Sequence, residues 1–246
     1  MRELFAQALL GDYDGEIGWD AVMKLRQDGS RPVFEQAAAW CLSGNPLERA
    51  RAADILGQPR LFRDESYLAV AKMLEHEDHP MVLDSVIHAL GHLENANAIP
   101  SILAYRNHAS GQVRRAVTFA LGCFPNHEES VRGLLDLTSD PDAGIRDWAV
   151  FSLGVLGDLD SPEIRVALLR CLCDTDEDVR EEAAVGLGKR GDRRLVPQLL
   201  TMLDAPGLND RVAEAAKALL GLDQDQPEWK AEDYRAALVR DYQIPE

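Results

Sequence analysis

Hydrophobic residues recur along the chain with a helical period, and the pattern itself repeats about every 33 residues. A leucine followed by a glycine recurs in register at six positions, with glycine spacings of 34, 31, 32, 34 and 33 residues. The six glycines are Gly57, Gly91, Gly122, Gly154, Gly188 and Gly221. Mostly apolar residues stand nine, five and one positions before each glycine, and these positions share one face of a helix. The pattern therefore predicts an amphipathic helix before each glycine.

The ends of these helices are also marked. Twelve positions before the glycines stand Asn45, His79, Ser110, Asp142, Asp176 and Asn209, and all but the histidine are preferred N-cap residues. We expect each glycine to end its helix in the left-handed conformation. A second apolar segment lies between successive capped helices, at 67–74, 99–105, 131–137, 164–172 and 196–203. Two helices per unit predict an array of helical hairpins.

The predicted fold is therefore all-α: an α-solenoid of about six helical hairpins that forms one domain over residues 1–246. The repeats occupy 45–222. Residues 1–44 contain apolar helical stretches without the repeat positions, and we expect them to form an N-terminal helical cap. Residues 223–246 are the predicted C-terminal cap, with a final helix at 227–240 whose inner side carries Trp229, Tyr234 and Leu238. Such end units shield the last apolar face of a solenoid.

Two stretches carry a family resemblance. The run Val179–Asp192 and the run Asp140–Ala149 resemble the phycobilisome (PBS) lyase HEAT-like repeats of bacterial HEAT-repeat proteins. In such repeats a column of arginines bonds neighbouring turns, and Arg49, Arg114, Arg146 and Arg180 stand in that column here, whereas Leu83 and Ala213 depart from it. The resemblance covers residues 45 to about 222. It implies the fold but no single function, because the family mixes scaffolds, lyase subunits and hydroxylases.

The charge balance limits the partners that we expect. Lysine and arginine number 26 against 42 aspartates and glutamates, which gives a formal net charge of −16. Phosphate backbones and anionic lipid surfaces carry the same sign, so we expect a protein or peptide partner rather than nucleic acid or a membrane. The charge favours a basic or apolar partner; in the alternative interpretation it serves solubility alone. The sequence contains no apolar run long enough for a membrane span. Its four cysteines lack the spacing of a disulfide framework, which favours the cytoplasm.

The resemblance also implies that the second helix of each repeat lines the concave, partner-binding side. The positions three and seven before each glycine are expected to lie opposite the core. With their neighbours they predict an aromatic stripe flanked by carboxylates. The predicted partner-binding residues are His88, Arg115, Phe119, Asp147, Trp148, Phe151, Glu181, Glu182 and Glu214. In the alternative interpretation, Trp148 and Phe151 pack between repeats and the carboxylates form a solvated face.

Neither a cofactor site nor a catalytic or metal motif emerges from the sequence. The acidic run 174–178 lacks the glycine and the distal glutamate of a calcium loop, and helix capping explains it better. His88 and His92 have the spacing of two metal ligands, but Gly91 is expected to end the helix between them, and no third ligand is apparent. Cys171 and Cys173 would point about 200° apart on a helix, so they cannot share one metal.

Some enzymes with a similar fold carry features that this sequence lacks. Deoxyhypusine hydroxylases hold iron with His-Glu pairs in their second helices, whereas His76-Glu77 and His127-Glu128 lie outside those helices here. HEAT-like DNA glycosylases need a basic concave face, whereas this chain has an acidic net charge. The leading hypothesis is a scaffold or adaptor, and its more specific form is an inhibitory or immunity-type partner of a basic effector. The alternative is a lyase or chaperone-like subunit acting on a tetrapyrrole or a modified side chain.

Overall fold

The computed structural model describes residues 1–58, 62–222 and 229–244, and every regular element within these ranges is helical. The chain divides into two compact units, which we call unit 1 (Met1–Phe124) and unit 2 (Pro125–Glu246). Within the described residues no helix combines the length and the apolar character needed to cross a membrane. The all-α solenoid architecture predicted from the repeat is confirmed.

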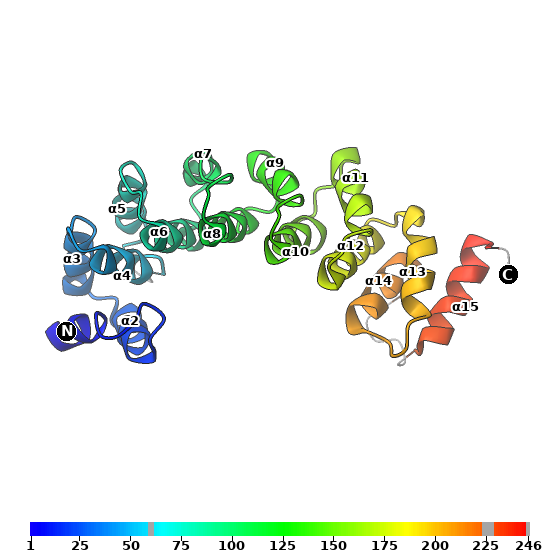
Figure 1. The fold of residues 1–246 in the computed structure, drawn as a ribbon, viewed down its shortest axis with the longest axis horizontal. Helices are drawn as coiled ribbons and strands as arrows, with labels where there is room; N and C mark the ends of the chain where they lie inside the picture. Colours follow the sequence, from blue (N-terminus) through cyan, green and yellow to red (C-terminus); the bar gives the residue numbers. More distant parts are fainter. Residues whose placement is uncertain (59–61, 223–228, 245–246) are drawn as a thin grey trace. The chain divides into compact units, whose positions relative to one another are not determined.

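Unit 1 is built on three neighbouring helices that correspond to the predicted capped helices. Its elements are α1 (Arg2–Gln7), α2 (Glu16–Asp28), α3 (Arg31–Trp40), α4 (Pro46–Leu56), α5 (Arg63–Leu74), α6 (Pro80–Leu93), η1 (Ala96–Ala98), α7 (Ile99–Leu103) and α8 (Gly111–Gly122). Helix α6 packs between α4 and α8, while α5 and α7 lie on one side of this row (Figure 1). Helix α2 packs against α4.

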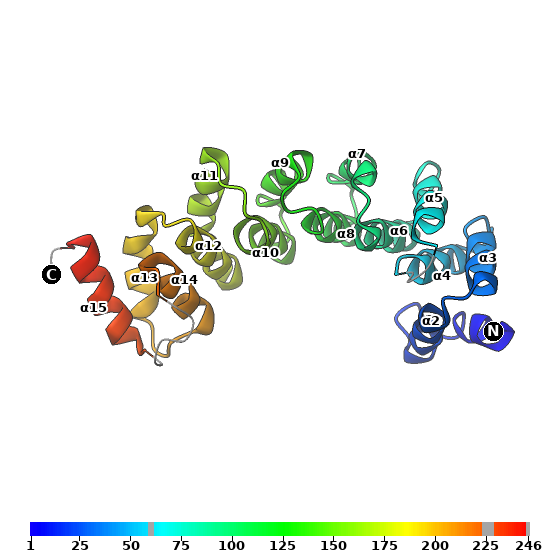
Figure 2. The ribbon, with the colours of Figure 1, turned by 180° about the vertical axis from the view of Figure 1, so that it is seen from behind.

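Unit 2 repeats the same two layers. Its elements are α9 (Glu128–Leu137), α10 (Ala143–Phe151), η2 (Ser152–Leu156), α11 (Pro162–Cys171), α12 (Glu177–Lys189), η3 (Arg193–Leu195), α13 (Val196–Leu203), α14 (Asp210–Leu220) and α15 (Ala231–Tyr242). Helix α12 packs between α10 and α14, and the layering within each unit can be followed from behind in Figure 2. The segment η2 continues α10 as a turn of π-helix.

The predicted helix starts are confirmed. The six residues twelve positions before the glycines are the N-caps of α4, α6, α8, α10, α12 and α14. The Asn45 side chain accepts a hydrogen bond from the Leu47 amide at 3.0 Å, as a capping residue does. His79 makes no such bond, and the Glu77 Oε1 atom instead accepts from the His79 amide at 3.0 Å.

The predicted role of the repeat glycines is correct only at Gly221, which ends α14 with φ +64°. Gly57 has a right-handed conformation, and α6 and α12 continue past Gly91 and Gly188. These glycines instead allow two backbones to approach closely. A Cβ added to Gly91 would lie 2.8 Å from the Cα atom of Ala120 on the next second helix. The glycine column thus sets the distance between second helices.

Arg49 and Arg146 of the arginine column tie the turns of neighbouring repeats, as the resemblance implied. Arg180 instead donates to the Asp174 and Thr175 carbonyl oxygens in the turn before its own helix. In unit 2, Arg146 Nε and Nη2 donate to the two carboxylate oxygens of Asp174 at 2.8 and 2.7 Å. Its Nη1 atom donates to the Asp140 carbonyl oxygen at 2.9 Å. In unit 1, Arg49 makes the corresponding pair of bonds to Glu77 at 2.7 and 3.0 Å. These two-point arginine–carboxylate bonds fix the stagger of successive repeats.

The chain ends cover the terminal apolar faces. Tyr234 and Leu238 on α15 are 1% and 0% exposed, as predicted for the inner side of this helix. The residues 223–228 and 245–246, which include the start of the predicted cap and of its helix at 227, lie outside the described residues. At the other end, Val22 and Leu25 on α2 are fully buried. The helices at both ends therefore bury apolar side chains inside their units.

The close approach at the glycine column predicts a stability effect. We expect Gly91→Ala to lower the free energy of unfolding by about 1 kcal/mol. Overpacking destabilises by roughly 1–3 kcal/mol, and the higher helix propensity of alanine offsets about 1 kcal/mol of this. Gly44→Ala is the control, because a Cβ at Gly44 meets nothing within 4 Å. Urea unfolding measures both variants. A Gly91→Ala protein as stable as the wild type would contradict the assigned role.

Candidate partner-binding site

The positions predicted to lie opposite the core are only partly exposed, which corrects the sequence analysis. Among the positions three before the glycines, Asp54 and Val185 are buried. Among those seven before, Ala50 and Glu181 are buried as well. The close approach of second helices covers part of this face, and Asp54 is further covered by Tyr13 of the segment before α2. The polar and aromatic side chains that remain accessible therefore form local groups, and these groups differ between the two units.

In unit 1, the predicted residues His88 and Phe119 contact each other. Their ring centroids are 4.9 Å apart, and the ring of His92 lies 5.0 Å from Phe119 on another side. His88 and His92 share one face because α6 runs past Gly91, contrary to the predicted stop. Arg115 lies exposed on α8. In the part of the chain that the structure describes, no three histidines, cysteines or carboxylates are placed to hold a metal ion.

In unit 2, one arginine that was not predicted gathers three of the predicted residues. The Nη2 atom of Arg211, at the start of α14, forms an ion pair with Glu182 Oε1 at 2.6 Å, and its Nη1 atom donates to Glu214 Oε2 at 3.0 Å. Its guanidinium carbon also lies 5.7 Å from the ring centroid of Phe151. Trp148, 42% exposed, meets Phe151 edge to face with centroids 5.7 Å apart. The result is a site of carboxylates beside two aromatic rings.

Two carboxylate oxygens in this site have no hydrogen-bond donor. Asp147 Oδ1 and Glu182 Oε2 are both buried and unpartnered within the described residues. Glu182 is only 7% exposed, and its Oε2 atom is shielded from bulk solvent. An unsatisfied buried acceptor costs roughly 1–3 kcal/mol, and more when it is charged. The site therefore contains more buried negative charge than Arg211 neutralises.

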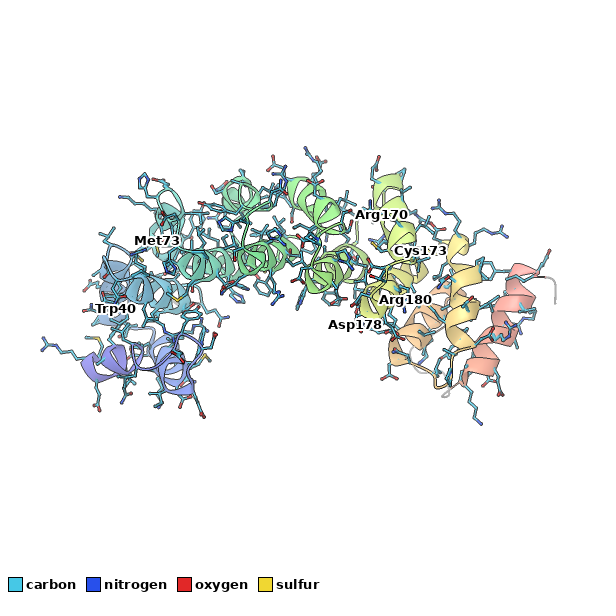
Figure 3. All side chains as sticks on the ribbon, in the orientation of Figure 1. Trp40, Met73, Arg170, Cys173, Asp178 and Arg180 are labelled. Carbon is cyan, nitrogen blue, oxygen red and sulfur yellow. The ribbon has the colours of Figure 1, made fainter. Side chains whose placement is uncertain are left out.

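The pKa values of these carboxyls reflect the same excess of negative charge. Burial raises the pKa of Glu182 to about 7; Arg211 opposes this shift, while Asp147 and Glu214 add to it. Burial, with Asp178 and Asp176 nearby, raises the pKa of Asp147. Figure 3 shows Asp178 on the far side of α12 from Arg170 of α11. A cation placed among these groups would be stabilised, and it would lower their pKa values.

Glu181, although predicted as part of the same surface, has a different role. Its Oε1 atom accepts a hydrogen bond from Asn209 Nδ2 at 2.9 Å, and Asn209 is the N-cap of α14. Its side chain is therefore used to position the start of the next second helix. Sequence reasoning missed Arg211 and assigned Asp178 to capping alone. Both stand ten residues before a repeat glycine, in neighbouring repeats, and this shared position was the available signal.

Comparison with known proteins identifies the repeat. The family model for HEAT repeats matches residues 32–122 and 131–220, which confirms the HEAT resemblance. Protein YibA of Escherichia coli K12 is 29% identical over 228 residues, covering 88% of this chain and 79% of YibA. The X-ray structure of YibA has a TM-score of 0.77 at 24% identity, over 99% of this chain and 92% of that one.

Two further solved structures resemble this chain. A designed armadillo repeat protein in complex with the peptide (KR)4 has a TM-score of 0.51 at 16% identity, over 89% of this chain and 97% of that one. The complex of CpcE and CpcF of phycocyanin lyase from Nostoc sp. has a TM-score of 0.49 at 20% identity, over 98% of this chain and 95% of that one. At these identities the likeness concerns the fold alone.

The pKa of Glu182 predicts a pH effect with a definite sign. Between the ordinary glutamate pKa of 4.5 and about 7, the unfolded chain releases a proton that folded Glu182 retains. Raising the pH across this window therefore lowers the free energy of unfolding, by up to about 3 kcal/mol from this group. Carbon-detected NMR should give a carboxyl midpoint near 7, and Arg211→Gln should raise it. A wild-type midpoint below about 5 would contradict the assignment.

Proposed function

Because the chain belongs to the HEAT-repeat family, we propose that it is a protein-binding scaffold that holds a basic segment of a partner on the second helices of unit 2. The observation that carries this proposal is the pair of buried, donorless oxygens on Asp147 and Glu182. A folded protein retains such groups at a cost in stability, and a ligand that supplies the donors removes that cost. Lysine and arginine side chains are the donors that also bring positive charge.

Arg211 indicates how a partner's arginine would be held. Its guanidinium pairs with the two carboxylates of Glu182 and Glu214 while it lies over the face of Phe151. An arginine from a partner can use the same combination beside Asp147, with Trp148 as an exposed aromatic neighbour. The net charge of −16 would speed the approach of a basic segment.

The fold also supports this function. HEAT and armadillo solenoids commonly serve as protein-binding scaffolds, and the designed armadillo repeat protein carries the basic peptide (KR)4. More specific forms of the proposal are an inhibitory or immunity-type partner for a basic effector, and a cytoplasmic location. The four free cysteines fit that location. A visible chromophore that copurifies with the chain would instead favour the tetrapyrrole lyase or chaperone-like alternative.

The carboxylates predict a binding defect that a fluorescent peptide of alternating lysine and arginine can report. The double variant Asp147→Asn with Glu182→Gln should weaken binding at least 10-fold by fluorescence anisotropy, since hydrogen bonds to charged groups are worth roughly 1.5–3 kcal/mol each. The control, Glu128→Gln with Glu129→Gln, removes two negative charges from exposed positions at the start of α9. It should leave the Kd within about 2-fold. Equal losses in both variants would mean that net charge, and not this site, binds the peptide.

The aromatic residues give a separate test. Phe119→Ala with Phe151→Ala should weaken the same peptide, because Phe151 supplies a cation-binding face in the carboxylate site. Both rings are only half-buried, so the helical content measured by circular dichroism should stay nearly unchanged. Phe151→Ala alone should account for most of the loss, since Phe151 lies in the carboxylate site. Normal binding by the double variant would remove the aromatic residues from the proposed function.

A further inference from the structure

A cavity of about 290 Å³ lies in unit 1, separate from the carboxylate site of unit 2. Helix α2 forms one wall with Trp19 and Arg26, and α6 forms the other with Asp84, His88 and His92. The segment before α2 contributes Asp14. The cavity is small for a ligand site and matches one amino-acid residue better than a cofactor.

The polar groups at the floor of the cavity already have hydrogen-bond partners. The Tyr13 hydroxyl donates to the Asp54 carboxylate at 3.2 Å and lies 2.6 Å from Ser85 Oγ. Arg51, which is fully buried, donates to the same carboxylate at 3.3 Å. These groups neutralise one another, so they hold α4 and α6 to the N-terminal segment and leave ligand binding to the walls.

One end of the cavity is negative. Asp14 and Asp84 both line this end. Burial raises the pKa of Asp84, His88 and a hydrogen bond from Gln112 lower it, and Asp14 raises it again while Arg115 lowers it. The Nδ1 atom of His88 lies 2.9 Å from the Asp84 backbone oxygen. A carbonyl oxygen only accepts, so Nδ1 carries the hydrogen in this bond, and it also lies 3.5 Å from Asp84 Oδ1. This end therefore offers acceptors to a cationic donor.

The other end is positive. Arg26 Nε donates to the Asp54 backbone oxygen at 2.8 Å and Nη1 contacts Met23 Sδ, and no ion pair engages this half-buried guanidinium among the described residues. Burial, His88 and Arg26 lower the pKa of His92 while Glu94 opposes the shift, which places the His92 ring near the Arg26 guanidinium. An anion bound between Arg26 and His92 would relieve this repulsion.

The two ends are separated by the length of the α6 wall. Asp84, His88 and His92 stand four residues apart, so they follow one face of the helix. At a rise of 1.5 Å per residue, Asp84 and His92 are about 12 Å apart along the axis. A ligand that contacts both ends needs a cation and an anion joined by a flexible stem.

We propose that this cavity binds an arginine or lysine residue with a free α-carboxylate, the carboxylate against Arg26 and His92 and the side-chain cation between Asp14 and Asp84. The aliphatic stem would cross the centre of the cavity, beside Ala89 and Trp19. The same chemistry is present in the free amino acid and at a protein C-terminus that ends in a basic residue. This site goes beyond the proposed function and involves none of its unit 2 residues.

Ligand analogues that each lack one charged group test the proposal on the full wild-type chain. Isothermal titration calorimetry should detect N-acetyl-glycyl-arginine with a free carboxylate, while its C-terminal amide and the norleucine acid should each bind at least 10-fold more weakly. Free L-arginine that binds as tightly as the peptide would identify the amino acid as the source, and tighter peptide binding would identify a chain terminus. Failure of the acid to bind, or equal binding of acid and amide, would overturn the proposal.

Variants locate the site and separate it from the proposed function. Asp84→Asn and Arg26→Lys should each weaken the acid at least 10-fold, and circular dichroism would check that α2 remains folded. Asp20→Asn removes an exposed carboxylate from the same helix α2 and should leave the affinity unchanged. The Asp147→Asn and Glu182→Gln double variant should also bind the acid normally. Loss in Asp20→Asn, or retention in both Asp84→Asn and Arg26→Lys, would contradict the site.

Discussion

The structure depends on the close contact of second helices at their small residues. In unit 2 a Cβ on Gly186 would lie 2.7 Å from the Cα atom of Gly154, and one on Gly188 would lie 2.5 Å from the Ala215 carbonyl oxygen. No larger side chain fits at this separation. The arginine–carboxylate bonds between turns, such as Arg146 to Asp174, set the stagger while the glycines set the spacing. Together they decide which side chains of successive repeats meet.

In each unit, one charged residue at the same repeat position is buried. Arg51 and Glu182 stand six residues before a repeat glycine, and both are buried. Arg51 is compensated: it donates to Asp54, to two backbone oxygens, and lies 4.7 Å from the Tyr13 ring centroid. Glu182 keeps one oxygen without a donor. The same position therefore stabilises the N-terminal segment in unit 1, whereas in unit 2 it contributes an unpartnered oxygen on which the proposed function rests.

The sequence was sufficient for the fold because capping, periodicity and the arginine column are local signals. The N-caps and the second helices follow from residue type and spacing alone. The role of Gly91 did not follow, because a glycine near a helix end fits both a left-handed stop and a close helix contact, and only the neighbouring Ala120 decides between them. Likewise, the sequence indicated Trp148 and Glu182, but the contribution of Arg211 required knowing which turns meet.

The central claim is that the carboxylates and rings of unit 2 receive a basic side chain. Isotope-filtered NOE spectroscopy tests it most directly, with a basic peptide carrying one labelled arginine bound to the full wild-type chain. The account predicts cross-peaks from the arginine side-chain protons to the rings of Phe151 and Trp148, since Phe151 contacts both Trp148 and the Arg211 guanidinium that pairs with Glu182. Cross-peaks only to residues outside this cluster, in a complex of the same affinity, would contradict it.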